Sequence, residues 1–344
     1  MRSQKDTSKF IPVSLLDIER AESSIKPYLN NTHVRTFPKF NKIMGHDIYF
    51  KMENLQKTGS FKYRGALYTI LELRNTTPKK IVTYGTGNHA VALAWAASKF
   101  LKIKITAYLT EFTSDIKKDL VKKYGANIII TKTRVEAEKK ARLDAKEEGT
   151  LLLAPSDNDD MIAGSGTVYL ESLEELGDKH IDAVFFPIGG GSISSGTVIV
   201  AKAKTPDTEI YAAEPKEAND ASMSYKAKKI CALKKSPETM ADGAKTIEIS
   251  KRVFEYIKKL NGIYEITEEE IAYWTLWLRH ITKSDCEPTS ALSIAAAHRW
   301  LKTKKDKKSI LVIITGQNIN QYTYKELELK DYLKTYPNNF YYAE

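Results

Sequence analysis

The sequence predicts an α/β fold with two lobes, each built on a parallel β-sheet. Short Val/Ile-rich runs alternate with longer helical patterns along most of the chain. Continuous apolar strands of this kind belong to parallel sheets that are covered by helices on both faces. A length of 344 residues is large for one hydrophobic core, so two lobes are expected. Ligand sites in such folds lie at the carboxyl ends of the strands.

Strands and helices are predicted in alternation. The predicted strands cover residues 48–53, 80–84, 103–109, 127–131, 183–188, 209–213 and 309–315. Helical patterns cover residues 90–100, 114–124, 135–148 and 164–176, and a further helix begins near residue 62. This order of elements justifies the two-lobed interpretation.

Composition excludes several classes of function. The net charge is +10, but the lysines are interleaved with Asp and Glu as on solvated helix faces, so no nucleic-acid binding is expected. No apolar run is long enough to span a membrane, and the first ten residues lack the apolar core of a signal peptide. Two cysteines, Cys231 and Cys286, provide no disulfide framework, which favours a reducing cytoplasmic location.

Lys62 stands in an unusual local setting. Thr58, Gly59 and Ser60 provide turn and N-cap chemistry just before a helical pattern, which places Lys62 on the first turn of that helix. The positive end of a helix and loss of solvent both lower the pKa of an ammonium group. A Schiff-base lysine needs such a neutral amine. An ordinary solvated lysine is the alternative from this residue alone.

Three polar loops follow predicted strands. They are Gly85-Thr86-Gly87-Asn88-His89, Gly189-Gly190-Gly191-Ser192 and Thr315-Gly316-Gln317-Asn318. Gly-rich loops that open a helix bind anions on their backbone N–H groups. Structural turns are the alternative interpretation for the first two loops.

The stretch from Gln56 to Ala66 resembles the cofactor-lysine motif of pyridoxal-phosphate enzymes of fold type II, in their serine/threonine dehydratase and serine racemase branch. The Arg64-Gly65-Ala66 ending distinguishes this branch from the cysteine-synthase branch, which continues Lys-Asp-Arg. The resemblance extends in order from about residue 15 to residue 318. It implies a tryptophan-synthase-β-like fold with pyridoxal 5'-phosphate in the cleft between the lobes.

The same resemblance implies the domain organisation and the site. Residues 1–79 and 159–344 would form the large cofactor-binding lobe, residues 80–158 a small mobile lobe, and the protein a homodimer. The implied cofactor contacts are Phe61, Lys62, Asn88, Gly189, Gly190, Gly191, Ser192 and Thr315. The implied substrate contacts are Ser60, Thr86, Gly87, Asn88 and His89.

Several positions depart from the family pattern. The phosphate loop usually has four glycines, whereas Ser192 stands in the fourth place. Racemases of the family have Ser at the position of Thr86, as a proton donor opposite the lysine, and threonine dehydratases commonly have Ala. Gly85 replaces a residue that is often Ser, and Gln317 replaces Gly. Racemisation of serine is therefore left open by the sequence.

A metal site is predicted after the strand at residues 209–213. Glu214 and Asp220 are two carboxylates on one loop with the Ala218 carbonyl between them, and oxygen ligands of this kind suit Mg²⁺ or Ca²⁺. Racemase-like members of the family hold a divalent cation (Mg, Ca or Mn) at matching positions. An ordinary acidic loop is the alternative. Glu287, followed by Pro288, either lies near the cofactor ring or begins a helix.

The resemblance implies an L-serine/L-threonine ammonia-lyase that acts on a small amino-acid substrate. The products would be pyruvate or 2-oxobutyrate and ammonia, with Lys62 as cofactor anchor and base and Thr86 as a second catalytic residue. Alternatives are a 3-hydroxyaspartate dehydratase, for which the sequence shows no cation to meet the second carboxylate, and a serine racemase proper. A β-replacement synthase and a non-enzymatic basic binding protein are alternatives of other classes.

Overall fold

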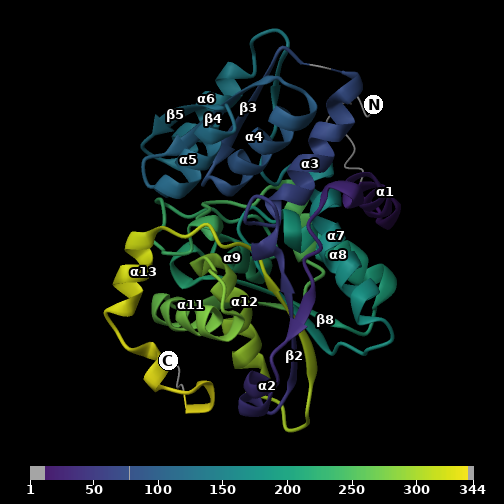
Figure 1. Cartoon of the computed structure of the whole chain (residues 1–344), viewed down its shortest axis with the longest axis vertical. Helices are drawn as coiled ribbons and strands as arrows, with labels where there is room; N and C mark the ends of the chain where they lie inside the picture. Colours follow the sequence, from purple (N-terminus) through teal and green to yellow (C-terminus); the bar gives the residue numbers. More distant parts are fainter. Residues whose placement is uncertain (1–11, 77, 340–344) are drawn as a thin grey trace.

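Two β-sheets organise the structure, a computed structural model that describes residues 12–76 and 78–339 (Figure 1). The larger sheet has the order β1-β2-β10-β7-β8-β9 and the smaller one the order β5-β4-β3-β6. Only the β1–β2 pair is antiparallel among the strand pairs of the described residues. The predicted fold class is confirmed.

The strands of the larger sheet are β1 (Val34–Thr36), β2 (Asp47–Met52), β7 (Ala183–Pro187), β8 (Glu209–Pro215), β9 (Gly262–Ile266) and β10 (Ser309–Ile314). Those of the smaller sheet are β3 (Lys80–Gly85), β4 (Lys104–Thr110), β5 (Asn127–Thr131) and β6 (Thr150–Leu152). The helices are α1 (Leu15–Ile25), α2 (Pro38–Met44), α3 (Lys62–Glu72), α4 (Asn88–Phe100), α5 (Asp115–Lys123), α6 (Arg134–Asp144), α7 (Asp159–Leu176), α8 (Ser192–Lys204), α9 (Asp220–Ala227), α10 (Lys251–Ile257), α11 (Glu268–Thr282), α12 (Pro288–Leu301) and α13 (Gln321–Glu328).

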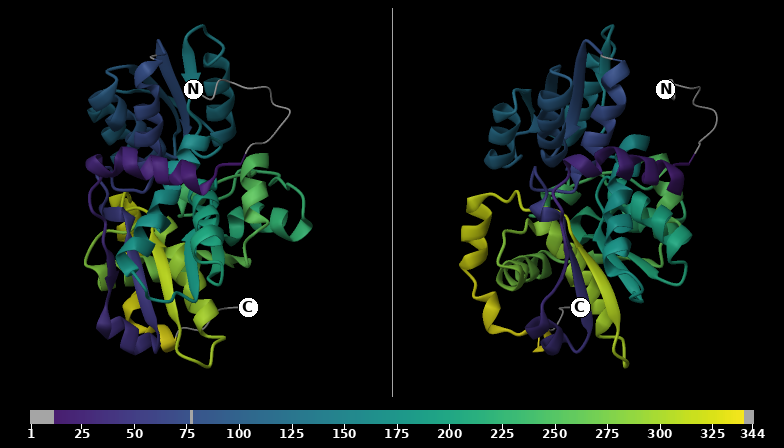
Figure 2. Two further views of the ribbon diagram at one scale, coloured as in Figure 1. Left: turned by 90° about the vertical axis from the view of Figure 1, so that its right-hand side faces the viewer. Right: turned by 45° about the vertical axis from the view of Figure 1, so that its right-hand side comes forward.

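Helices cover both faces of the larger sheet, as its continuous apolar strands require. Side chains alternate between the two faces of a strand, so neighbouring residues of β7 enter different cores. Phe185 packs edge-on against Trp300 of α12, with ring centroids 5.7 Å apart, whereas Phe186 belongs to the core beneath α7 and α8. Figure 2 shows α11 and α12 apart from α7 and α8 across this sheet. Both faces of β7 are therefore closed to solvent.

The four-stranded sheet is formed by residues 80–152, inside the range predicted for the small lobe. Helix α3 packs against α4 of this part and against α7 of the larger part, so it lies where the two parts meet (Figure 1). The movement of residues 80–158 as one lobe stays a prediction. Among the described residues, no helix is both long enough and apolar enough to cross a membrane.

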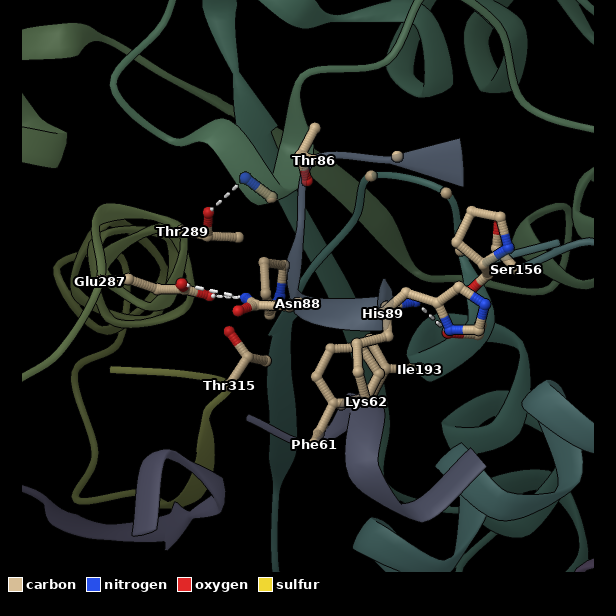
Figure 3. A pocket seen from close by; sticks show the side chains of 18 of the residues that line it. Phe61, Lys62, Thr86, Asn88, His89, Ser156, Ile193, Glu287, Thr289 and Thr315 are labelled. Atoms are coloured by element: carbon tan, nitrogen blue, oxygen red, sulfur yellow. Dashed lines mark hydrogen bonds between the residues drawn. The ribbon is translucent and has the colours of Figure 1, made fainter. Parts of the chain in front are cut away.

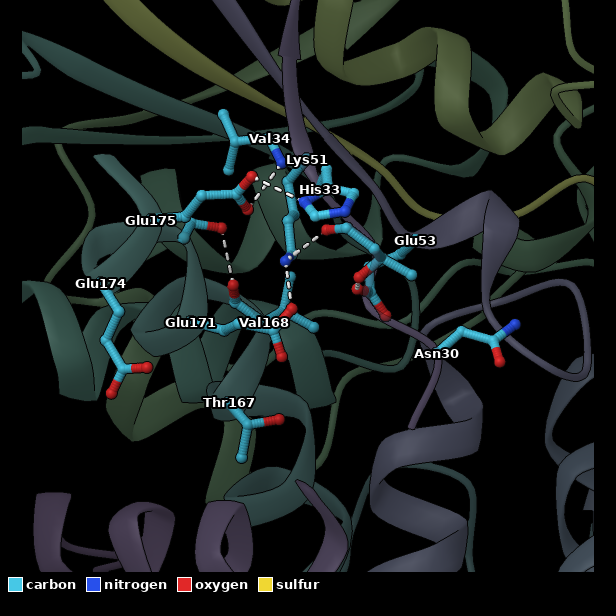
Figure 4. A network of polar contacts seen from close by, with 12 residues as sticks. Asn30, His33, Val34, Lys51, Glu53, Thr167, Val168, Glu171, Glu174 and Glu175 are labelled. Carbon is cyan, nitrogen blue, oxygen red and sulfur yellow. Dashed lines mark hydrogen bonds and ion pairs between the residues drawn. The ribbon is translucent and has the colours of Figure 1, made fainter. Parts of the chain in front are cut away.

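A buried ionic network anchors α3, the helix that carries Lys62. The Arg64 guanidinium donates to both carboxylate oxygens of Glu53, at 2.7 and 2.8 Å, and to both of Glu171, at 2.9 and 3.0 Å. Lys51 also pairs with Glu171, and Figure 4 shows its ammonium pointing toward that carboxylate. Arg64, Glu53 and Lys51 are fully buried. Bidentate pairs fix orientation as well as distance, so the network sets where the first turn of α3 begins.

The predicted cap of this helix is wrong in one detail. Lys62 is the first residue of α3, but the N-cap is Phe61, in a helical conformation and without a side-chain cap bond. Ser60 instead pairs its backbone with Gly316, so tertiary bridging replaces local capping at this end.

Candidate active site

One pocket collects loops from both sheets at the carboxyl ends of their strands (Figure 3). Lys62 comes from the start of α3, the Thr86 loop follows β3, the glycine loop follows β7, and Thr315 follows β10. The residues that line it are Phe61, Lys62, Gly85, Thr86, Asn88, His89, Arg134, Pro155, Ser156, Pro187, Gly189, Gly190, Gly191, Ser192, Ile193, Gly243, Glu287, Thr289 and Thr315.

Lys62 has two oxygen partners inside this pocket. Its Nζ lies 2.7 Å from the Pro155 carbonyl oxygen and 2.8 Å from Ser192 Oγ, and 4.9 Å from the centroid of the Phe61 ring. Burial, assisted by the positive charge of Arg134, lowers the pKa of Lys62 to about 7. The Lys62 side chain is partly buried and lines the pocket. An amine that is partly neutral near pH 7 is the form a Schiff-base lysine requires.

The glycine loop has no space for a side chain at two of its positions. A Cβ on Gly190 would lie 2.3 Å from Ser156 Oγ, and one on Gly191 would lie 2.2 Å from the Val253 side chain. Gly191 also has φ +89° and caps α8, a conformation that glycine adopts without strain. The N-terminus of α8 therefore opens directly onto the pocket, and unpaired N–H groups at such an end bind phosphate. These residues fit the phosphate of the predicted cofactor.

Asn88 is fixed from two sides. Its Nδ2 donates to both carboxylate oxygens of Glu287, at 2.9 and 3.0 Å, and its Oδ1 accepts from Asn318 Nδ2 at 2.9 Å. Glu287 is the N-cap of α12, with Pro288 at its first turn, so it both begins the helix and touches the pocket. This arrangement presents one defined face of the Asn88 amide to a ligand.

Thr315 has a hydroxyl proton to offer. Ser290 Oγ donates to the Gly316 carbonyl at 3.0 Å and accepts from the backbone N–H groups of Thr315 and Gly316 at 3.1 and 3.0 Å, so it has no lone pair left for the Thr315 hydroxyl, whose Oγ lies 3.3 Å away. The Thr315 hydroxyl can therefore donate its proton to an acceptor in the pocket.

His89 is held as the neutral imidazole. Its Nε2 lies 3.2 Å from the Leu153 carbonyl, and because a carbonyl only accepts, Nε2 carries the proton. Burial, together with the charge of Lys62, lowers the pKa of His89 to about 3. The side chain therefore offers no positive charge to a substrate carboxylate.

Two of the predicted substrate residues stand behind the pocket instead of lining it. Ser60 is fully buried, and its Oγ has no hydrogen-bond partner in the described structure. Gly87 is the N-cap of α4, at φ +118°, and a Cβ there would lie 2.8 Å from the Lys117 side chain. Gly87 thus lets α4 begin close beneath the pocket.

The predicted metal residues lie together away from the pocket lining. Glu214 accepts backbone N–H bonds from Ser222 at 2.6 Å and from Ala221 at 3.2 Å. Asp220 Oδ1 accepts from Thr246 at 2.8 Å, while its buried Oδ2 has no partner in the described structure. Burial raises the pKa of Asp220 to about 6, and burial and Asp220 raise that of Glu214. Within residues 12–76 and 78–339, no three His, Cys, Asp or Glu side chains are gathered for a metal.

A second charged group, which pairs with the pocket residue Glu287, carries no signal in the sequence. Lys117 of α5 is fully buried, and its Nζ lies 2.7 and 2.9 Å from the Asp242 carboxylate and 3.3 Å from Glu287. Burial acts to lower the pKa of Lys117, but the two carboxylates outweigh it and leave the pKa above its usual value. No local pattern marks this lysine, because it stands among other lysines of α5.

Arg134 was also missed, although it supplies a cation to the pocket lining. Its Nη1 donates to the Lys245 carbonyl at 3.4 Å. As the first residue of α6 it resembles, in the sequence, one more surface arginine. Thr86 borders this pocket and also an adjoining cavity, which Glu287, Asp242 and Lys245 line as well.

Known proteins match nearly the whole chain. Residues 25–316 match the family described as "Pyridoxal-phosphate dependent enzyme". A serine racemase of Dictyostelium discoideum is 37% identical over 316 residues, covering 90% of this chain and 95% of the relative. An L-threo-3-hydroxyaspartate ammonia-lyase of Saccharomyces cerevisiae is 34% identical over 317 residues, covering 90% and 95%.

Solved structures with a similar fold include a member of the same group of enzymes. The structure is similar to that of maize serine racemase, with a TM-score of 0.84 and 31% identity, covering 93% of this chain and 99% of that one. A lysine and a glycine loop that meet in one pocket, as Lys62 and residues 189–191 do here, are consistent with this family. The chain is thus a pyridoxal-phosphate-dependent enzyme of fold type II and belongs to the serine/threonine dehydratase and serine racemase family.

Proposed function

We propose that the protein is an L-serine/L-threonine ammonia-lyase, which gives pyruvate or 2-oxobutyrate and ammonia. The observation that carries the proposal is Lys62, whose pKa of about 7 and whose place at the glycine loop suit a residue that is both anchor and base. A base with a pKa near the working pH is the most effective proton acceptor. Cytoplasmic location and a homodimeric state are part of the proposal, supported by the two free cysteines and by the family.

Pyridoxal phosphate, when bound, supplies an electron sink for the carbanion that forms at the substrate Cα. Lys62 takes the Cα proton, and the nearby Pro155 and Ser192 oxygens keep its amine within the pocket. The start of α4 offers backbone N–H groups for the substrate carboxylate, as helix N-termini do for anions. Thr315, which lines the pocket, would offer a neutral hydroxyl to the ring nitrogen of the cofactor. A neutral donor would leave the cofactor a moderate electron sink, which suits elimination of the β-hydroxyl.

The test is ammonia release from a panel of hydroxy-amino acids, with chiral chromatography of the serine that remains. We expect keto acid and ammonia from L-serine and L-threonine. We expect D-serine to form slowly or not at all, because the methyl of Thr86 restricts the rotamers that could aim its hydroxyl at Cα. Absence of ammonia from every member of the panel would reject the proposal.

Arg134 favours a second candidate, 3-hydroxyaspartate. The second carboxylate of that substrate needs a cation, and Arg134 supplies one to the pocket lining. If this is the substrate, Arg134→Ala lowers ammonia release from 3-hydroxyaspartate by about 10²-fold or more, while release from L-serine is retained. Equal losses for both substrates, together with weaker cofactor binding, would place Arg134 on the cofactor instead.

We propose that a divalent cation (Mg, Ca or Mn) binds Glu214, the Ala218 carbonyl and Asp220. Two buried carboxylates lie together here, and the free Oδ2 of Asp220 is a ligand atom without another partner in the described structure. A cation would offset their mutual repulsion.

Chelation is therefore expected to lower the melting temperature and the activity, because an ion that binds only the folded form stabilises it. Restoring Mg²⁺ or Ca²⁺ should reverse both losses, as differential scanning fluorimetry and the ammonia assay would record. Asp220→Asn should remove the response to chelator. An unchanged melting temperature after exhaustive chelation of the wild-type protein would exclude the site.

A further inference from the structure

Ser192 makes a contact that its place in the glycine loop does not require. A phosphate loop binds anions through backbone N–H groups, and any residue at position 192 would keep its N–H at the start of α8. The side chain of Ser192 makes a second interaction, with Lys62. Its Oγ lies 2.8 Å from Lys62 Nζ, and the residue is 1% exposed.

The Lys62 amine has few hydrogen-bond partners, so the Ser192 hydroxyl can affect its protonation state. The amine has two hydrogen-bond acceptors among the described residues, Ser192 Oγ and the Pro155 carbonyl, and the Lys62 side chain is partly buried. Removing one acceptor from a partly buried ammonium leaves an N–H with fewer partners, which costs more than at the surface. Hydrogen bonds from a charged donor are about twice as strong as those from a neutral one. Ser192 therefore favours the ammonium form against the effect of burial.

We propose that Ser192 is a positioning residue for Lys62, whose hydroxyl holds the Lys62 amine beside the pocket whenever that amine is not bonded to the cofactor. The inference rests on the proposed role of Lys62 as the cofactor lysine. Ser192 approaches the amine from the start of α8 and Pro155 from the segment after β6, so the two residues hold it between the two parts of the protein.

The experiment measures how the cofactor-free protein captures an aldehyde at Lys62 as a function of pH. Full-length protein is incubated with pyridoxal 5'-phosphate or with pyridoxal, which lacks the phosphate. Cyanoborohydride then traps the product, and peptide mass spectrometry quantifies the label on Lys62. Capture needs the neutral amine, so its midpoint reports the pKa of Lys62. The exposed Lys57 serves as an internal control in the same digest.

We expect Ser192→Ala and Ser192→Gly to shift the midpoint down by about 0.5–1 pH unit with both aldehydes, because the ammonium loses an acceptor. Ser192→Thr keeps a hydroxyl and should stay near the wild-type value. Ser195→Ala is the matched control, since this buried serine of the same helix has no hydrogen-bond partner for its hydroxyl in the described structure.

Three outcomes would overturn the inference. An unchanged midpoint in Ser192→Ala would show that the hydroxyl does not act on the amine. A change with pyridoxal 5'-phosphate alone would place the hydroxyl on the phosphate. Absence of label on Lys62 in the wild-type protein would remove the proposed role of Lys62 together with this one. A variant that still captures the cofactor at Lys62 has folded. Ser192→Gly gives the four-glycine loop that is usual in the family, and it provides a second test if Ser192→Ala does not fold.

Discussion

Replacing Lys62 by alanine is expected to abolish ammonia release, with a loss of more than about 10³-fold. The amine is the one group among the described pocket residues that combines a nucleophile with a pKa near 7. Loss of the side chain removes the covalent anchor and the base together. The glycine loop remains intact, so we expect the variant to retain cofactor through its phosphate but without a link that borohydride reduces.

Lys57→Ala is the matched control, because this lysine lies in the same motif but is exposed, with its Nζ 5.8 Å from the Trp95 ring centroid. It should keep both the activity and the reducible link. Absorbance of the bound cofactor, reduction with borohydride and the ammonia assay together separate the two roles of Lys62. A reducible link that persists in Lys62→Ala would contradict the assignment.

The strands that deliver the pocket loops could be predicted from sequence because their pattern is local. The run predicted at 183–188 ends one residue earlier in the structure, at Pro187, and the run predicted at 309–315 also ends one residue earlier, at Ile314. A parallel sheet covered on both faces requires uninterrupted apolar strands, so the signal needs no knowledge of the partners. Polar and Gly-rich residues directly after such strands then mark the ligand edge of the sheet.

The short elements at the start of the chain could not be predicted in this way. β1 covers three residues, Val34–Thr36, and none of them is buried. Its three residues are too few to show an apolar alternation in the sequence. The strand is defined by its antiparallel pairing with β2, which is a tertiary contact and not a local propensity.

Two charged residues, Arg134 in the pocket lining and Lys117 beside Glu287, could not be predicted for a related reason. Lys117 is separated from Asp242 by 125 residues and belongs to a helix rich in lysine, where a solvated face is the ordinary interpretation. Its burial depends on how α5 meets the segment before α10. Arg134 likewise becomes a pocket residue only when α6 packs beside the glycine loop. Long-range packing determines these positions, and the family motif does not include them.

Breaking the buried group around Lys117 is expected to give a large loss of stability. Lys117→Met leaves the Glu287 carboxylate, whose side chain is 3% exposed, without its cation. Asp242, at 26% exposure, can recover part of its hydration. Burial and Asp242 already act to raise the pKa of Glu287, and Lys117 opposes them. Removing one partner of a buried ion pair costs about 3–5 kcal/mol, since the remaining charge stays uncompensated.

Lys118→Met tests whether burial is the cause. This neighbour on α5 pairs at 3.4 Å with Asp115, whose side chain is 74% exposed, and such surface pairs contribute about 0–1 kcal/mol. Urea unfolding at one fixed cofactor concentration gives both losses under equal conditions, because bound cofactor adds to the apparent stability. Adding Glu287→Gln to Lys117→Met should recover part of the loss, because the amide keeps an acceptor for Asn88 without a buried charge. Equal losses in Lys117→Met and Lys118→Met would mean that burial of the ion pairs of Lys117 is not the cause of the loss.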